Sequence, residues 1–112
     1  MEVDVRGRKS SVPDVVRVQA QAKVARVGRL SPVLQRAEVR LAEDPEAPGG
    51  GGHVCEVVAE GHGHVIRARA RSRDLLVAVD LAVAKLAHQA ERLKGKLVGR
   101  SHPRRSRTLS KA

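Results

Sequence analysis

The sequence has no phenylalanine, tyrosine or tryptophan among its 112 residues. Many readers of single-stranded RNA hold the bases by stacking them on aromatic rings, so recognition of the RRM, cold-shock or OB type is disfavoured. The one cysteine, Cys55, has no partner for an internal disulfide, and its apolar neighbours in HVCEVVA predict a small core residue without chemistry of its own. Contacts to phosphate, ribose and groove shape remain as the means of binding nucleic acid.

Long apolar runs are also missing. None reaches the roughly 18 residues of a membrane span, and the N-terminal residues MEVDVRGRK lack the apolar stretch of a signal peptide, so we expect a cytoplasmic protein with no membrane partner. Positive charge is abundant instead. The chain is long enough for one domain, and its 22 Lys and Arg against 12 Asp and Glu give a formal net charge of +10. This charge favours a polyanionic partner, with nucleic acid first.

Strict alternation of apolar and charged residues predicts four β-strands. They cover residues 1–7, residues 34–43 and the two arms of a hairpin over residues 53–71. If His62 and Gly63 form a two-residue turn, Val57 lies opposite Ala68 and every inward-facing residue of the hairpin meets another one. The predicted register is therefore consistent with a buried face.

Apolar residues spaced three and four apart predict two helices, one from about Asp14 to Val27 and one from about Asp74 to Leu97. Ser11 and Asp14 fit a capping box at the start of the first helix. The element order is then β-α-β-β-β-α. Because both helices need an apolar surface to bury against, we expect an α+β fold in which they pack on one face of a four-stranded sheet.

Two segments lie outside these elements. Residues 44–52, DPEAPGGGG, are expected to form an acidic and mobile loop. Gly99 begins a basic stretch, residues 99–112, that is poor in apolar residues and is expected to be a flexible tail or the start of a linker. The globular domain is thus predicted over residues 1–98.

The stretch IRARARSR places an arginine ladder on the uncovered face of the expected sheet. Glu56 is predicted to lie opposite Arg69, and such cross-strand pairs stabilise a solvated sheet face. We therefore expect the ladder to be largely neutralised and the usable positive charge to lie on the helices and the tail. The charged residues assigned to this face are Glu2, Asp4, Glu38, Glu56, Glu60, Arg6, Arg36, Arg40, Arg67, Arg69 and Arg71.

Two stretches carry a resemblance to a known family. GRKSSVPDVV and above all SRDLLVAVDLAVAKLAHQAERLKGKL, together with the element order, resemble the ribosome hibernation promoting factor family, also called ribosome-associated inhibitor or protein Y. The family motif near the second helix combines an Asp, an Ala-x-Asp and a Lys-Leu-x-x-Gln followed by basic residues. The residues in those places are Asp74, Ala78, Asp80, Lys85, Leu86, Gln89, Arg92 and Lys94, and Lys23 matches a lysine of the first helix.

The resemblance implies a protein that binds the small ribosomal subunit, contacts 16S rRNA in the decoding cleft, competes with tRNA and mRNA, and inhibits translation in stationary phase or stress. It implies neither an enzyme nor a cofactor. Long members of the family append a dimerising domain, so ribosome dimers are expected only if such a domain follows residue 112. The expected rRNA-binding residues are Lys23, Arg26, Arg71, Arg73, Lys85, Gln89, Arg92, Lys94, Lys96, Arg100, Arg104 and Arg105.

Other interpretations of the sequence have less support. His62 and His64 lack a cysteine or a carboxylate pair nearby, so no metal site is expected. GGGGH lacks the Gly-Lys-Ser/Thr ending of a phosphate loop, and no serine has a His/Asp partner at a position that suggests catalysis. The rival hypothesis is a structural ribosomal protein or a double-stranded RNA module that remains in its particle permanently.

Overall fold

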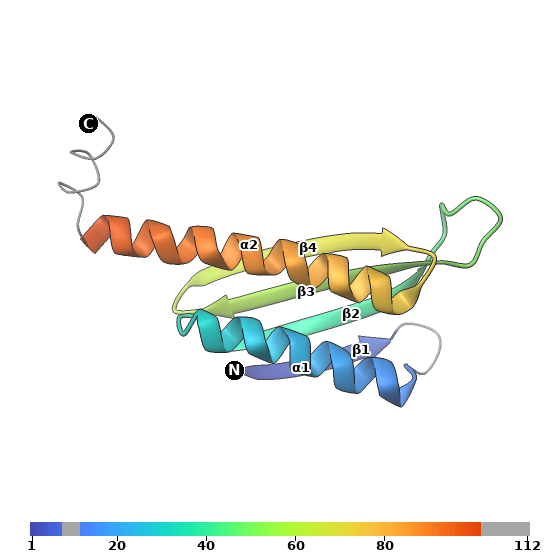
Figure 1. The fold of residues 1–112 in the computed structure, drawn as a ribbon, viewed down its shortest axis with the longest axis horizontal. Helices are drawn as coiled ribbons and strands as arrows, with labels where there is room; N and C mark the ends of the chain where they lie inside the picture. Colours follow the sequence, from blue (N-terminus) through green and yellow to red (C-terminus); the bar gives the residue numbers. More distant parts are fainter. Residues whose placement is uncertain (8–11, 102–112) are drawn as a thin grey trace.

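A computed structural model describes residues 1–7 and 12–101, the side chains of residues 98–101 excepted. Figure 1 shows a sheet with both helices lying in front of it, so the predicted α+β fold is confirmed. The elements are β1 (Glu2–Gly7), α1 (Asp14–Leu30), β2 (Arg36–Asp44), β3 (Gly52–Gly61), β4 (His64–Ser72) and α2 (Leu75–Ser101).

The four strands lie in the order β1-β2-β3-β4, which leaves β1 and β4 as the two edges of the sheet. β1 is parallel to β2 and is joined to it through α1, whereas the other neighbours are antiparallel. The hairpin of β3 and β4 has the predicted register, with Val57 opposite Ala68. His62 and Gly63 form its turn with φ angles of 52° and 81°, as a type I′ turn requires.

The core lies between the helices and one face of the sheet, and Cys55 is buried in it as predicted. Leu86, Val24 and Val39 are among its largest fully buried side chains. Alanines supply much of the rest, and such small side chains allow the helices to lie close to the sheet, so a core without aromatic rings can still pack densely. The buried alanines are Ala20, Ala37, Ala59, Ala68, Ala70, Ala78, Ala82 and Ala90.

The start of α1 differs from the prediction. Its N-cap is Pro13, and no side chain caps the helix, so the capping box expected at Asp14 is wrong; Ser11 lies outside the described residues. The Pro13 carbonyl accepts hydrogen bonds of 3.0 Å from the N–H groups of Val16 and Arg17. Because proline lacks an N–H and has a helix-compatible φ, it starts the helix without a polar side chain.

The end of α1 lies three residues beyond the predicted Val27, at Leu30. A contact with a residue distant in the sequence accounts for the longer helix. Gly28 is buried, and a Cβ added to it would lie 2.7 Å from the Met1 Cβ, so the first residue of the chain packs directly over the last turn of the helix. This contact holds a glycine in a helix that sequence patterning alone would end earlier.

α2 begins where predicted but ends later. Asp74 is its N-cap, since the Asp74 Oδ1 accepts a hydrogen bond of 2.9 Å from the Leu76 N–H. The predicted end at Leu97 is wrong, because the helix continues through Gly99 to Ser101. A glycine costs a helix about 1 kcal/mol relative to alanine, which is too little to stop one whose earlier turns are anchored on a sheet.

Candidate nucleic-acid interface

Three of the predicted rRNA-binding residues, Arg92, Lys94 and Lys96, lie on the C-terminal half of α2 with exposed side chains. None of them forms an ion pair with another described residue, and the same holds for the exposed Arg26 of α1. Figure 1 shows α2 extending past the turn between β3 and β4. This part of the helix therefore carries exposed cations that no carboxylate of the described residues neutralises.

Lys23 and Asp80, which both belong to the family motif, join the two helices. The Lys23 Nζ lies 2.9 Å from the Asp80 Oδ1, and both side chains are partly exposed. An exposed pair of this kind contributes less than about 1 kcal/mol to stability. Its main effect is to direct the Lys23 side chain toward α2 instead of outward.

Lys85 and Gln89 use their side chains to close the edge of the sheet at β4. The Lys85 Nζ donates to the Arg69 carbonyl at 2.9 Å, and the Gln89 Nε2 donates to the Arg67 carbonyl at 2.6 Å. An edge strand presents unpaired backbone groups that can recruit another strand, and covering them prevents such pairing. We call these two residues the β4 edge guard, and their first role is structural.

The opposite edge, β1, is closed in the same way by α1. The Arg17 NH1 donates to the Val5 carbonyl at 2.7 Å, and the Gln21 Nε2 donates to the Val3 carbonyl at 3.3 Å. Both guards use residues four apart, a spacing that places two side chains one above the other on one flank of a helix. Sequence reasoning missed Arg17 and Gln21, although this spacing is visible in the sequence.

Removing the β4 edge guard is expected to weaken the fold and to permit self-association. Substituting alanine for both Lys85 and Gln89 should lower the free energy of unfolding by about 1 kcal/mol, since two partly exposed hydrogen bonds are lost. The uncovered β4 edge should then produce dimers or larger species. Urea denaturation and sedimentation velocity would measure the two effects. Lys94→Ala, which changes an exposed lysine of the same helix, is the control, and equal behaviour of both variants would contradict the guard.

Arg71 and Arg73, also predicted to bind rRNA, hold the glycine-rich loop over residues 44–52. Arg71 lies 3.8 Å from the Asp44 carboxylate, whose side chain is only 8% exposed, and 3.6 Å from that of Glu46. The Arg73 guanidinium donates to the carbonyls of Pro48 and Gly50 at 2.6 and 3.2 Å, within the same loop. Both arginines therefore have intramolecular partners.

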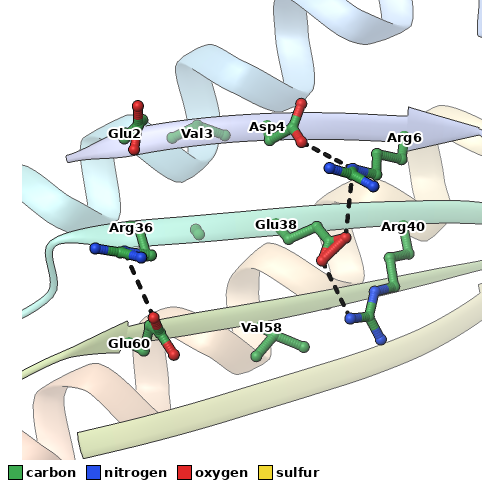
Figure 2. Close-up of a pocket in the computed structure, with 10 residues that line it drawn as sticks. Glu2, Val3, Asp4, Arg6, Arg36, Glu38, Arg40, Val58 and Glu60 are labelled. Carbon is green, nitrogen blue, oxygen red and sulfur yellow. Dashed lines mark hydrogen bonds and ion pairs between the residues drawn. The ribbon is translucent and has the colours of Figure 1, made fainter. Parts of the chain in front are cut away.

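Ion pairs cover the part of the open sheet face that β1 and β2 form, as Figure 2 shows. The Arg6 Nε lies 2.8 Å from Asp4 and 3.6 Å from Glu38. Arg40 contacts Glu38 at 3.1 Å, and its hydrogen bond lowers the pKa of the Glu38 carboxyl. The hydrogen bond from Arg6 to Asp4 likewise raises the pKa of Arg6. Positive and negative charges thus cancel locally on this surface.

The arginine ladder of β4 is neutralised less than predicted. Glu56 does lie opposite Arg69 in the register, but its carboxylate contacts Arg40 of β2 at 3.4 Å. Neither Arg67 nor Arg69 forms an ion pair with a described residue, so the prediction of a largely neutralised ladder is wrong for these two. Glu56 has a cross-strand arginine on each side, and the sequence does not tell which one it contacts.

Other kinds of site find little support in the described part of the chain. No three of its His, Cys, Asp and Glu residues gather closely enough to hold a metal ion. Burial raises the pKa of the Cys55 thiol to about 12, so this group is not a nucleophilic thiolate at neutral pH. No described helix is long and apolar enough to cross a membrane.

The basic C-terminal residues extend beyond what is described. Arg104 and Arg105 lie outside the described residues, and Arg100 lies in α2 but its side chain is not described. The remaining predicted residues fall into two groups. Lys23, Lys85 and Gln89, with Arg71 and Arg73, have partners within the domain, whereas Arg26, Arg92, Lys94 and Lys96 are exposed to solvent.

Fold and charge together define a small basic α+β domain, equipped for contacts to phosphate and built without Phe, Tyr or Trp. The family model of the Sigma 54 modulation protein / S30EA ribosomal protein matches residues 3–98, and the chain belongs to this family. The family comprises ribosome-associated proteins and is not a family of enzymes. The resemblance inferred from the sequence is therefore confirmed.

Two solved structures share the fold. One is a ribosomal subunit interface protein from Coxiella burnetii, with a TM-score of 0.74 and 19% identity over 85% of this chain and 99% of that chain. The other is the N-terminal domain of Protein Y from Thermus thermophilus, with a TM-score of 0.69 and 25% identity over 83% of this chain and 99% of that chain. No match was found among curated proteins.

Proposed function

We propose that this protein is a ribosome hibernation factor. It binds the small ribosomal subunit at the decoding cleft, contacts 16S rRNA there, excludes tRNA and mRNA, and so inhibits translation in stationary phase or stress, in the cytoplasm where ribosomes are. The observation that carries the proposal is the group of unpaired cations on α2 in a member of a ribosome-associated family. Cations without carboxylate partners are free to neutralise phosphates and release their counterions.

The predicted rRNA-binding residues divide into direct contacts and supporting ones. Arg92, Lys94 and Lys96, with Arg26, are proposed to contact phosphates directly, because their side chains are exposed and form no ion pair with a described residue. Lys23, Lys85, Gln89, Arg71 and Arg73 are proposed to contact rRNA only with the part of their donor capacity that their partners in the domain leave open. Arg100, Arg104 and Arg105 are proposed to add positive charge to the interface. We therefore propose that residues 1–98 form the ribosome-binding domain and that residues 99–112 contribute additional basic residues.

The proposal is tested by comparing the amount of this protein on ribosomes from growing cells with the amount on ribosomes from stationary cells. Lysates of growing and of stationary cells are separated on sucrose gradients at low salt, and the protein is quantified in each fraction with a specific antibody. We expect it on small subunits and whole ribosomes from stationary cells and at most in trace amounts on those from growing cells. One copy per ribosome during exponential growth would contradict hibernation and favour a structural ribosomal protein.

A further inference from the structure

The backbone of β4 alternates between groups that face β3 and groups that face outward. The two-residue turn makes Gly61 and His64 a hydrogen-bonded pair, and bonded and non-bonded pairs alternate along an antiparallel hairpin. Val65, Arg67 and Arg69 therefore direct their backbone N–H and C=O groups away from β3, toward the side that α2 covers. The two bonds of the β4 edge guard end on this row of carbonyls.

The β4 edge guard covers the backbone of Arg69 and Arg67 but not that of Val65, the next outward-facing residue toward the turn. Lys85 and Gln89 are four residues apart, and the next position on the same stripe of α2 is Leu93, which carries no donor. Among the residues of β4 with outward-facing backbone groups, Val65 is the one near Leu93, and both line the same groove. No side chain of α2 among the described residues donates to the backbone of Val65 as Lys85 and Gln89 do to Arg69 and Arg67.

A groove with a volume of about 550 Å³ lies at this place. Its wall on the α2 side carries Arg92 and Lys96, and no carboxylate lines it. The hollow on the open sheet face, drawn in Figure 2, has four carboxylates in its lining, and the one beside the 44–52 loop has two, Glu43 and Asp44. The residues that line the groove are His64, Val65, Ile66, Gln89, Arg92, Leu93 and Lys96.

The groove also contains a ring. Because the chain has no Phe, Tyr or Trp, its five histidines are its only aromatic side chains. His64 is half-buried at the start of β4 and lines the groove, beside the apolar side chains of Ile66 and Leu93. Nucleobases stack on histidine and not only on the larger aromatic rings.

We propose that this groove binds one unpaired nucleotide of an RNA strand. Arg92 and Lys96 neutralise its phosphate, the base stacks on His64, and the edge of the base meets the N–H and C=O of Val65. A volume of this size suits a nucleotide. A peptide strand fits less well, because strand addition needs several open residues, and here the unguarded stretch is a single one. The proposal rests on the proposed function only in taking ribosomal RNA as the source of the nucleotide.

The test uses a short single-stranded RNA with one central 2-aminopurine, read by fluorescence titration against the full chain. The protein has no Phe, Tyr or Trp, so its own fluorescence does not interfere. Binding of the unsubstituted protein should quench the 2-aminopurine. His64→Ala should weaken binding roughly tenfold and remove the quenching, since one stacked base is lost. His64→Phe should keep both, which guards against a loss caused by misfolding.

Matched controls decide where the effect arises. His62→Asn changes a histidine at the tip of the turn and should leave binding and quenching unchanged, because asparagine also tolerates a positive φ. Undiminished quenching with His64→Ala would overturn the proposal. So would equal binding of a duplex of the same sequence, or displacement of the RNA by a glutamate-rich peptide at equal concentration, which would make the groove a protein site.

Small-subunit binding measured in parallel separates this proposal from the function on which it draws. If His64→Ala binds small subunits as tightly as the unsubstituted protein while reversal of Arg92 and Lys96 abolishes binding, the nucleotide site fails and the proposed function stands. If the RNA is bound and quenched as described but the protein does not sediment with small subunits, the proposed function fails and the nucleotide site stands.

Discussion

Reversing the charges of Arg92 and Lys96 together, as Arg92→Glu with Lys96→Glu, is expected to weaken binding to isolated small ribosomal subunits by roughly 100-fold, about tenfold for each charge. Both side chains are exposed and without ion pairs in the described part of the chain, so little stability should be lost. The slope of log K against log salt should also decrease by about two, one for each phosphate contact removed. Filter binding or sedimentation at several salt concentrations measures both quantities.

Arg67→Glu with Arg69→Glu is the matched control for this experiment. These two arginines are also exposed and unpaired among the described residues, and their reversal changes the net charge by the same amount on the open face of the sheet. A general electrostatic attraction would be weakened equally by either pair. We expect the control to retain most of its affinity and to lose stability instead, because the new glutamates lie near Glu56 and Glu60. Equal loss of binding from both pairs would refute an interface on the helix side.

Gly61→Ala is expected to destabilise the domain by about 3 kcal/mol or more. Gly61 is buried at the end of β3, where the segment before β2 crosses it. A Cβ added there would lie 2.7 Å from the Gln35 backbone nitrogen and would collide with the Val33 carbonyl oxygen. Since these atoms are backbone, no side chain can rotate away. Relief would have to disturb the hydrogen bond of 2.8 Å from the Gln35 N–H to the Glu60 carbonyl.

Gly63→Ala provides the comparison, because it adds the same methyl group two residues away. Gly63 has a φ of 81°, and nothing lies within 4 Å of an added Cβ, so the only cost is the left-handed conformation, about 1 kcal/mol. Urea denaturation followed by far-UV circular dichroism gives both values. If the two variants were equally stable, the close approach of residues 33–35 to Gly61 would not exist in solution.

Parts of the fold that depend on local periodicity could be predicted from the sequence. The alternation in β3 and β4 and the two-residue turn at His62 and Gly63 leave one register in which every inward-facing residue of the hairpin meets another one, and that register is present. The C-terminal end of α1 could not be predicted as well, because a tertiary contact sets it. This contact is the packing of Met1 over Gly28, and nothing local in the sequence reveals it.

In the candidate site, too, the sequence placed residues on their elements but did not show what those residues contact. Lys85 and Gln89 could be placed on one flank of the second helix, and their family motif pointed to function. Whether that flank faces RNA or the edge of β4 depends on strand order, which alternation does not determine. His64 was visible as a hairpin residue, but its place in a groove with Arg92 requires the crossing of α2 over the start of β4.

The connection between β1 and β2 affects how the molecule opens under thermal fluctuation. β1 pairs with β2 alone, and this parallel pairing is made only after the chain has passed through α1. β3, β4 and α2 are instead consecutive in the chain, over residues 52–101, and are packed on one another. Terminal strands with distant partners open at lower free energy than locally connected elements. Local unfolding that begins at β1 therefore leaves folded the part of the domain that carries the groove and the exposed cations Arg92, Lys94 and Lys96 of α2.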